Sequence, residues 1–205
     1  MNKKLWEASD SAKNKSNLFK YENFLSENYN YKISKKYSKL LNWSVKNQKE
    51  FWNSIWDFCN VKGNKNYKFK YSKNIIKNRF LLNSELNFAE NLLSKNDNTK
   101  AVTFISESGF KEYKTWNQLN LNTSKIIQFF SKIKVREKDR IAAYMPNIIE
   151  TVESFLATIS IGAIWSSCSP DFGANGVIER FAQIKPKVLI ISDRYFYNGK
   201  EINVI

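Results

Sequence analysis

The sequence predicts an α/β fold, in which a partial parallel sheet with flanking helices follows a mostly helical N-terminal segment. Two observations support it. Short apolar runs alternate with amphipathic stretches of helical spacing across residues 139–193, in the order β-α-β-α-β. Helices of this length between strands imply right-handed crossovers and therefore parallel strands. Ligands of such sheets bind beyond the carboxyl ends of the strands, here at Pro146-Asn147, at residues 169–173 and from Asp193 onward.

The first hundred residues give one clear helix. Residues 1–20 are polar and have neither the apolar core nor the cleavage pattern of a signal peptide, which predicts a disordered start and a cytoplasmic protein. From Asn47 to Cys59 a helix is predicted, with an apolar stripe made of Phe51, Trp52, Ile55, Trp56 and Cys59. This stripe suits packing onto a domain or binding to a bilayer surface. Uncharged and acidic side chains dominate the polar face after Lys49, which favours packing. Residues 60–77 are expected to form an irregular connection with one short strand.

A hairpin and a capped helix are predicted next. Residues 101–106 and 110–114 are expected to pair as strands around Ser108-Gly109. Thr115 and Gln118 have the spacing of a capping box, which opens a helix. One side of this helix carries Trp116, Leu119, Thr123, Ile126, Ile127 and Phe130.

The β-α-β-α-β stretch begins with a strand from Ile141 to Met145, because Pro146 disfavours helical backbone in the residue before it. Asn147 is expected to cap the following helix and Gly162 to end it. The predicted core face of that helix consists of Ile148, Ile149, Val152, Phe155, Leu156 and Ile159.

A second strand is predicted from Ala163 to Ser167, followed by the loop at 169–173 and a second helix that Pro186 ends. The apolar residues of this helix are Val177, Ile178, Phe181 and Ile184. Val188 to Ile191 is a continuous aliphatic run, which predicts a strand that is covered on both faces.

The net charge of +14 raises the possibility of a nucleic-acid partner. The excess charge lies in the first half: residues 1–100 have a balance of +11 and residues 101–205 of +3. Of the 33 basic residues 28 are Lys, whereas base readout and bidentate phosphate contacts favour Arg. We therefore expect no nucleic-acid partner, and drift toward Lys and Asn explains the composition better.

Several kinds of site are excluded by composition. The chain has no His, which removes Ser-His and Cys-His catalysis and His ligation of metals. Cys59 and Cys168 are far apart and are expected to be reduced and buried. No G-x-x-x-x-G-K-[ST] or G-x-G-x-x-G motif is present to bind ATP phosphates. Polar residues interrupt the longest apolar region, so no membrane span is predicted. We assign no catalytic residue and no metal ligand.

The runs MPNIIETVESFLATISIGAIWSSCSPDFG and ERFAQIKPKVLIISDRYFYNGK resemble the acyl-CoA synthetase group of adenylate-forming enzymes. LNWSVKNQKEFWNSIWDFCNV and LNFAENLL extend the resemblance upstream. The run from Trp165 to Gly173 is similar to the branch of acetoacetate-CoA ligases, because the acetate-specific relatives usually have a His-Ser and a Gly-Gly-Phe there.

The resemblance implies a synthetase-type N-terminal segment at residues 1–97 and the incomplete start of an AMP-binding domain at 98–205. It implies ligation of acetoacetate to CoA through an acyl-adenylate, with ATP, CoA and Mg²⁺ as cofactors of a complete enzyme. Family members are about three times as long as these 205 residues, so a fragment without turnover is expected. Two alternatives stay open: a synthetase for acetate or propionate, and a non-catalytic α/β interaction module.

The resemblance also implies a CoA site. Relatives hold the nucleotide end of CoA with an Arg-x-Gly-Arg stretch, where this chain has Tyr197, Asn198, Gly199 and Lys200. The loop with Asp171, Phe172 and Gly173 is expected to border the CoA channel. The alternative interpretation of residues 197–200 is an ordinary Asn-Gly turn with a solvated lysine. The alternative for the loop at 169–173 is an ordinary turn without a ligand. Lys138 stands where relatives usually have Gly, which predicts a strained turn.

Overall fold

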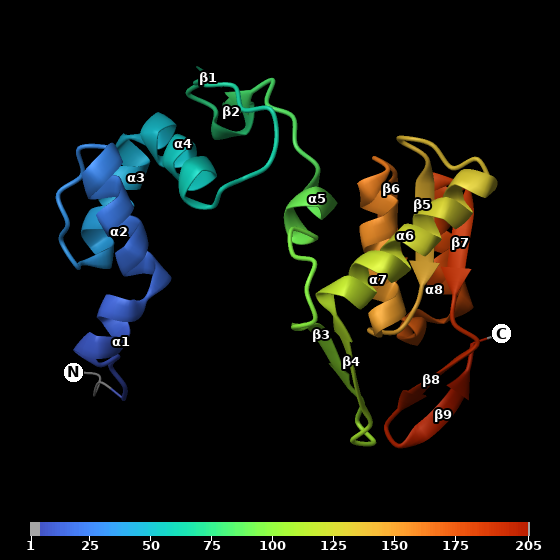
Figure 1. Ribbon diagram of the computed structural model, residues 1–205. Helices are drawn as coiled ribbons and strands as arrows, with labels where there is room; N and C mark the ends of the chain where they lie inside the picture. The colour runs from blue at the N-terminus through green and yellow to red at the C-terminus, as the bar shows by residue number, and fades with distance from the viewer. Residues whose placement is uncertain (1–4, 205) are drawn as a thin grey trace. The chain divides into compact units, whose positions relative to one another are not determined.

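The computed structural model describes residues 5–204 and divides into two compact units between Leu86 and Asn87 (Figure 1). This division lies before the predicted boundary at 97/98, because the short helix α5 (Phe88–Leu92) packs on α7 (Ile149–Ser160) of the second unit. The Asn87 side-chain amide also donates to the carbonyl oxygen of Ile159 over 3.0 Å. No helix within residues 5–204 has the length and apolar character needed to cross a membrane.

The first unit is mostly helical. Its elements are α1 (Asp10–Lys15), α2 (Asn17–Asn28), α3 (Tyr37–Lys46), α4 (Gln48–Phe58), β1 (Lys68–Lys70), the 3₁₀ turn η1 (Ile75–Lys77) and β2 (Arg79–Leu82). The predicted disorder of residues 1–20 is wrong from residue 10 onward. Ser9 and Ser16 act as N-caps, since their hydroxyls accept from the N–H groups of Ala12 and Phe19. Residues 1–4 lie outside the described part of the chain.

The core of this unit is aromatic. Its buried residues are Tyr21, Leu25, Tyr31 and Leu40, and Phe51, Ile55 and Phe58 of α4 pack against them. The predicted α4 stripe is therefore a packing face, and Trp56 on it is buried. Cys59 is free but exposed, against the expectation that both cysteines are buried, because it follows the last residue of α4 as its C-cap. Cys168 is free and buried as expected.

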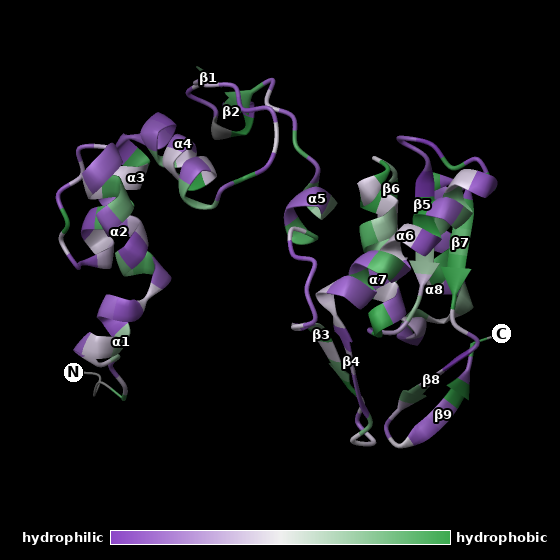
Figure 2. Cartoon of the chain, viewed as in Figure 1, coloured by the Kyte–Doolittle hydropathy of each residue, from purple (hydrophilic) through white to green (hydrophobic). Residues whose placement is uncertain are grey.

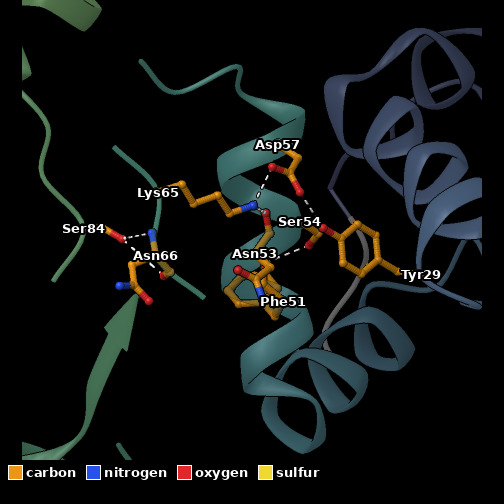
Figure 3. Close-up of polar contacts among 8 residues, drawn as sticks. All are labelled: Tyr29, Phe51, Asn53, Ser54, Asp57, Lys65, Asn66 and Ser84. Carbon is orange, nitrogen blue, oxygen red and sulfur yellow. Dashed lines mark hydrogen bonds and ion pairs between the residues drawn. The ribbon is translucent and has the colours of Figure 1, made fainter. Parts of the chain in front are cut away.

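A polar network fixes α4 to its neighbours (Figure 3). The ammonium of Lys65, whose side chain is only 10% exposed, donates to Asp57 over 2.5 Å and to the carbonyl of Asn53 over 3.2 Å. The hydroxyl of Tyr29 donates to the other carboxylate oxygen of Asp57 over 2.6 Å. Both oxygens of this carboxylate thus join α4 to segments before and after it.

The second unit starts with the predicted hairpin and helix. Strands β3 (Lys100–Ile105) and β4 (Lys111–Thr115) are antiparallel, and α6 (Trp116–Lys132) follows. The capping box is confirmed: the Thr115 hydroxyl accepts from the N–H of Gln118, and the Gln118 side chain accepts from the N–H of Thr115.

The sheet of the second unit is parallel, as predicted, with strand order β6-β5-β7. Its strands are β5 (Arg140–Tyr144), β6 (Ile164–Cys168) and β7 (Val188–Ile191), connected by α7, the 3₁₀ turn η2 (Pro170–Phe172) and α8 (Gly173–Ile184). An antiparallel hairpin of β8 (Arg194–Tyr197) and β9 (Lys200–Asn203) follows. The fold class is therefore confirmed.

Helices cover the two faces of this sheet unequally. On one face the buried core consists of Phe130, Val135, Ile141, Ala157 and Ala163. On the other, α8 packs over Ala142 and Cys168 through Val177 and Phe181. Leu189 pairs with Ala142 in register, yet it is 51% exposed, because α8 lies over β5 and β6. The expected burial of β7 on both faces is thus wrong, although the strand is strongly hydrophobic (Figure 2).

Two finer predictions also differ. The N-cap of α7 is Ile148, which has no side-chain cap bond, rather than Asn147. Ile178 of α8 is 63% exposed, because only the side of α8 that carries Val177 and Phe181 faces the sheet. Gly162 follows the C-cap of α7 with a φ of 71°, as expected for a helix-ending glycine.

Candidate functional site

A cavity of about 530 Å³ lies beyond the carboxyl end of β5. Its walls come from the tip of the β3–β4 hairpin, from the loop after β5 and from β8: Phe104, Ile105, Ser106, Glu107, Ser108, Phe110, Pro146, Asn147, Ile148, Arg194, Tyr195 and Phe196. Two of these three segments, the loop after β5 and the residues after Asp193, are predicted from the sequence to border a ligand. The third, the hairpin tip, has no signal in its sequence beyond a Ser-Gly turn.

The predicted CoA residues Tyr197 to Lys200 form the turn of the β8–β9 hairpin. Asn198 and Gly199 have φ values of 52° and 70°, the two consecutive left-handed conformations of a type I′ turn. Tyr197 and Lys200 pair across the turn and close the loop. The Asn-Gly turn of the alternative interpretation is therefore present, and its geometry decides where the two backbone N–H groups point.

Both N–H groups point at one carboxylate. The N–H of Asn198 donates to Oε2 of Glu107 over 3.0 Å, and the N–H of Gly199 donates to Oε1 over 2.9 Å. Figure 1 shows the tips of the two hairpins side by side. Sequence reasoning missed Glu107, because it lies 91 residues before Asn198 in an unrelated turn.

The loop with the other predicted residues is held in place by hydrogen bonds. The carboxylate of Asp171 accepts from the Ser169 hydroxyl over 2.7 Å and from the Tyr195 hydroxyl over 3.0 Å. Burial, followed by this bond to Asp171, raises the pKa of Tyr195 above its usual value. The Tyr144 hydroxyl donates to the carbonyl of Pro170 over 2.7 Å. The loop is thus fixed to both β5 and β8.

Phe172 and Gly173 complete the loop. The Arg180 guanidinium lies 3.9 Å from the centre of the Phe172 ring, a cation–π contact, and the ring is 47% exposed. Gly173 has a φ of 63° and opens α8 in a conformation that favours glycine.

The two predicted groups are joined through β8. Asp171 bonds Tyr195, which lies two positions before Tyr197 on the same strand. Tyr195 and Glu107 also line the 530 Å³ cavity, whereas the predicted residues themselves are not among its lining within residues 5–204. The site residues predicted from sequence therefore lie outside the lining of this cavity. Ser192, just after β7, has a buried hydroxyl without a partner among the described residues.

Charged side chains of both signs lie at this edge. Arg194 is held by Asp193 over 3.1 Å and by Glu201 over 2.7 Å, so its charge is already balanced. Lys200 follows the turn directly and is exposed. Backbone N–H groups of a turn, together with a lysine, bind phosphate groups in many proteins. No group of three acidic, Cys or His side chains that could hold a metal ion occurs within residues 5–204.

Comparisons with known proteins found a matching family and individual relatives. The sequence profile described as AMP-binding enzyme matches residues 89–203. Acetoacetyl-coenzyme A synthetase of Rhizobium meliloti (strain 1021) is 42% identical over 169 residues, which are 82% of this chain and 26% of that protein. Acetoacetyl-CoA synthetase of Xenopus tropicalis is 41% identical over 170 residues, which are 80% of this chain and 25% of that protein.

A solved structure is similar over almost the whole of this chain. Acetoacetyl-CoA Synthetase from Streptomyces lividans superposes with a TM-score of 0.91 at 27% identity and covers 98% of this chain. The match takes up 32% of that protein's chain. The chain therefore spans about a quarter of the length of the curated relatives it matches and about a third of the solved structure.

Proposed function

Since this chain belongs to the AMP-binding enzyme family, we propose that it forms the N-terminal part of an acetoacetate-CoA ligase, an acid-thiol ligase. Such an enzyme joins acetoacetate to CoA and converts ATP to AMP and diphosphate. The observation that carries the proposal is the 42% identity to an acetoacetyl-coenzyme A synthetase over 82% of this chain. The part of the reaction that we assign to these residues is the binding of CoA.

The phosphate end of CoA is proposed to bind at the β8–β9 turn. The N–H groups of Asn198 and Gly199 are already aimed at an anionic group, and Lys200 adds a positive charge beside them. The ring of Tyr197 is 57% exposed at the end of β8, where it can stack on the adenine base.

The loop after β6 is proposed to border the same ligand through Phe172 and Gly173. Phe172 offers an exposed ring, and the absence of a side chain at Gly173 leaves open space beside the backbone. Asp171 has a positioning role in this proposal, because its oxygens already accept hydrogen bonds from Ser169 and Tyr195.

Calorimetric titration of the 205-residue chain with CoA tests this site. We expect Lys200→Ala to weaken CoA binding about tenfold, because a hydrogen bond to a charged group is lost. Lys132→Ala removes the same charge from the exposed end of α6 and serves as the matched control, with unchanged binding. Equal CoA affinity in both variants would exclude the turn as the phosphate contact.

The residues present do not fit ATP and Mg²⁺. The sequence has no glycine-rich phosphate loop, and the described residues contain no cluster of metal ligands. We therefore assign these cofactors to no residue and expect no turnover by this chain alone. Formation of AMP that depends on both acetoacetate and ATP, measured with the purified chain, would contradict that expectation.

Acid specificity is tested with a chimera. Residues 1–205 replace the corresponding part of the Rhizobium meliloti synthetase, whose unmodified form is the positive control. We expect the chimera to release diphosphate fastest with acetoacetate. An equal or faster rate with acetate, at unchanged specificity of the control, would favour a synthetase for another short acid.

A further inference from the structure

The β8–β9 turn binds the carboxylate of Glu107. Each of its carboxylate oxygens accepts one hydrogen bond from the turn, over 3.0 Å from Asn198 and 2.9 Å from Gly199. Glu107 comes from the tip of another hairpin, between Ile105 at the end of β3 and Lys111 at the start of β4. The turn is therefore bound by a group from outside its own hairpin.

The backbone of the turn is shaped for an anion. With φ of 52° and 70°, two successive residues direct their N–H groups to the same side, where they form a small positive concavity. A carboxylate with two oxygens on two N–H groups presents the same charge and the same spacing of acceptors as two oxygens of a phosphate. A carboxylate and a phosphate cannot both occupy this concavity, because both groups are negatively charged.

We infer that Glu107 is an internal competitor for the phosphate group that the Asn198–Gly199 turn binds. This inference rests on the proposed function, because it concerns the same turn. A ligand phosphate replaces the Glu107 carboxylate on the two N–H groups, and the carboxylate moves into water. Glu107 thereby lowers the affinity for phosphate-bearing ligands, and it selects those with further contacts at this edge, such as the stacking ring of Tyr197.

The exchange also changes the cavity. Glu107 lines the 530 Å³ cavity, and its carboxylate joins the tip of the β3–β4 hairpin to the turn that follows β8, whose residues Arg194 to Phe196 form another wall of the cavity. When phosphate displaces the carboxylate, this connection between the β3–β4 and β8–β9 hairpins is broken. Phosphate binding at the turn and loosening of the cavity wall are therefore one event.

Nuclear magnetic resonance of the ¹⁵N-labelled 205-residue chain tests the competition, with inorganic phosphate as the probe. The signals are the amides of Asn198 and Gly199. We expect Glu107→Ala to shift both amides without phosphate and to lower the half-saturating phosphate concentration about tenfold, the value of one charge-assisted hydrogen bond. Glu112→Ala removes the same charge from β4 of the same hairpin and is the matched control, with no change at either amide.

Glu107→Gln is the second variant if Glu107→Ala does not fold, and we expect it to lower the concentration about threefold, because a neutral acceptor is weaker. Equal half-saturating phosphate concentrations in the wild type and in a folded Glu107 variant would overturn the inference. It would also be overturned if phosphate shifted the Asn198 and Gly199 amide signals in neither protein. Inorganic phosphate separates this result from the proposed function. If CoA fails to bind while phosphate competes with Glu107, the CoA assignment fails and the competition stands.

Discussion

The backbone N–H of Lys138 donates to the carbonyl oxygen of Gly162 over 2.9 Å, and both residues have left-handed backbones, with φ of 66° and 71°. This bond joins the turn before β5 to the turn before β6. Gly162 adopts its conformation without strain, whereas the Cβ of Lys138 makes the same conformation costly. The sequence predicts a strained turn at Lys138. The structure places this residue at a contact between the turns that precede two neighbouring strands, β5 and β6.

Lys138→Gly should stabilise the second unit. Relief of the left-handed strain exceeds the added entropy of the unfolded chain, so we expect a gain of about 0.5–1 kcal/mol in the free energy of unfolding. Urea unfolding measures it. Lys125→Gly, on an exposed position within α6, is the control and should lose about 1 kcal/mol. A loss of stability in Lys138→Gly would show that the turn is not strained.

Thr115→Ala should destabilise α6, because it removes the acceptor of the Gln118 N–H and half of the capping box. The expected cost is about 1 kcal/mol in the free energy of unfolding. Thr115→Ser keeps the hydroxyl and should lower the free energy of unfolding by at most about 0.3 kcal/mol. The prediction fails if both variants unfold at the same urea concentration.

Glu153→Gln should stabilise the second unit at neutral pH. Glu153 is buried on α7, and this burial raises the pKa of its carboxyl above 4.5, although a hydrogen bond from Asn122 over 2.7 Å opposes the shift. The folded state therefore binds the proton more tightly than the unfolded state, and stability falls as pH rises through the raised pKa. Thermal unfolding should favour the Gln variant at pH 7 and show no advantage at pH 3. A pH-independent difference would contradict this sign.

Lys65→Met should lower the free energy of unfolding of the first unit by about 1 kcal/mol, because Asp57 loses its ammonium partner. The loss is no larger because Asp57 is partly exposed, so water screens its charge. Burial alone would raise the pKa of Asp57, but the hydrogen bonds from Lys65 and Tyr29 outweigh it and lower that pKa. This stabilisation is present above pH 3.8 and is lost as pH falls through the folded-state pKa. Unfolding from pH 7 to pH 2 should show a smaller pH dependence in Lys65→Met, and Lys39→Met, which removes an exposed lysine of α3, is the comparison.

Much of the second unit could be predicted from sequence because its signals are local. The capping box of Thr115 and Gln118 lies within one turn of helix, and the apolar runs of β5 and β7 lie within single strands. Periodicity did not show which side of β7 is covered, because that depends on where α8 crosses the sheet. The prediction of disorder for residues 10–20 was wrong, because it did not use the ordinary N-cap signals of Ser9 and Ser16.

The candidate site was only partly accessible to sequence reasoning. The Asn198-Gly199 dipeptide indicates a tight hairpin turn by itself. Its partner Glu107 is set by the approach of two hairpins far apart in the chain, and nothing in the local sequence of either hairpin encodes that approach. The bond from Tyr195 to Asp171 has the same origin, since it requires β8 to return to the loop after β6.

The strand order β6-β5-β7 places the first-synthesised strand at the centre of the sheet. β5 pairs with β6 on one side, with Arg140 against Ile164, and with β7 on the other, with Ile141 against Val188. Neither outer strand pairs with the other, so both depend on β5 for the backbone hydrogen bonds of this sheet. A change that unfolds β5 therefore leaves β6 and β7 without a partner in this sheet.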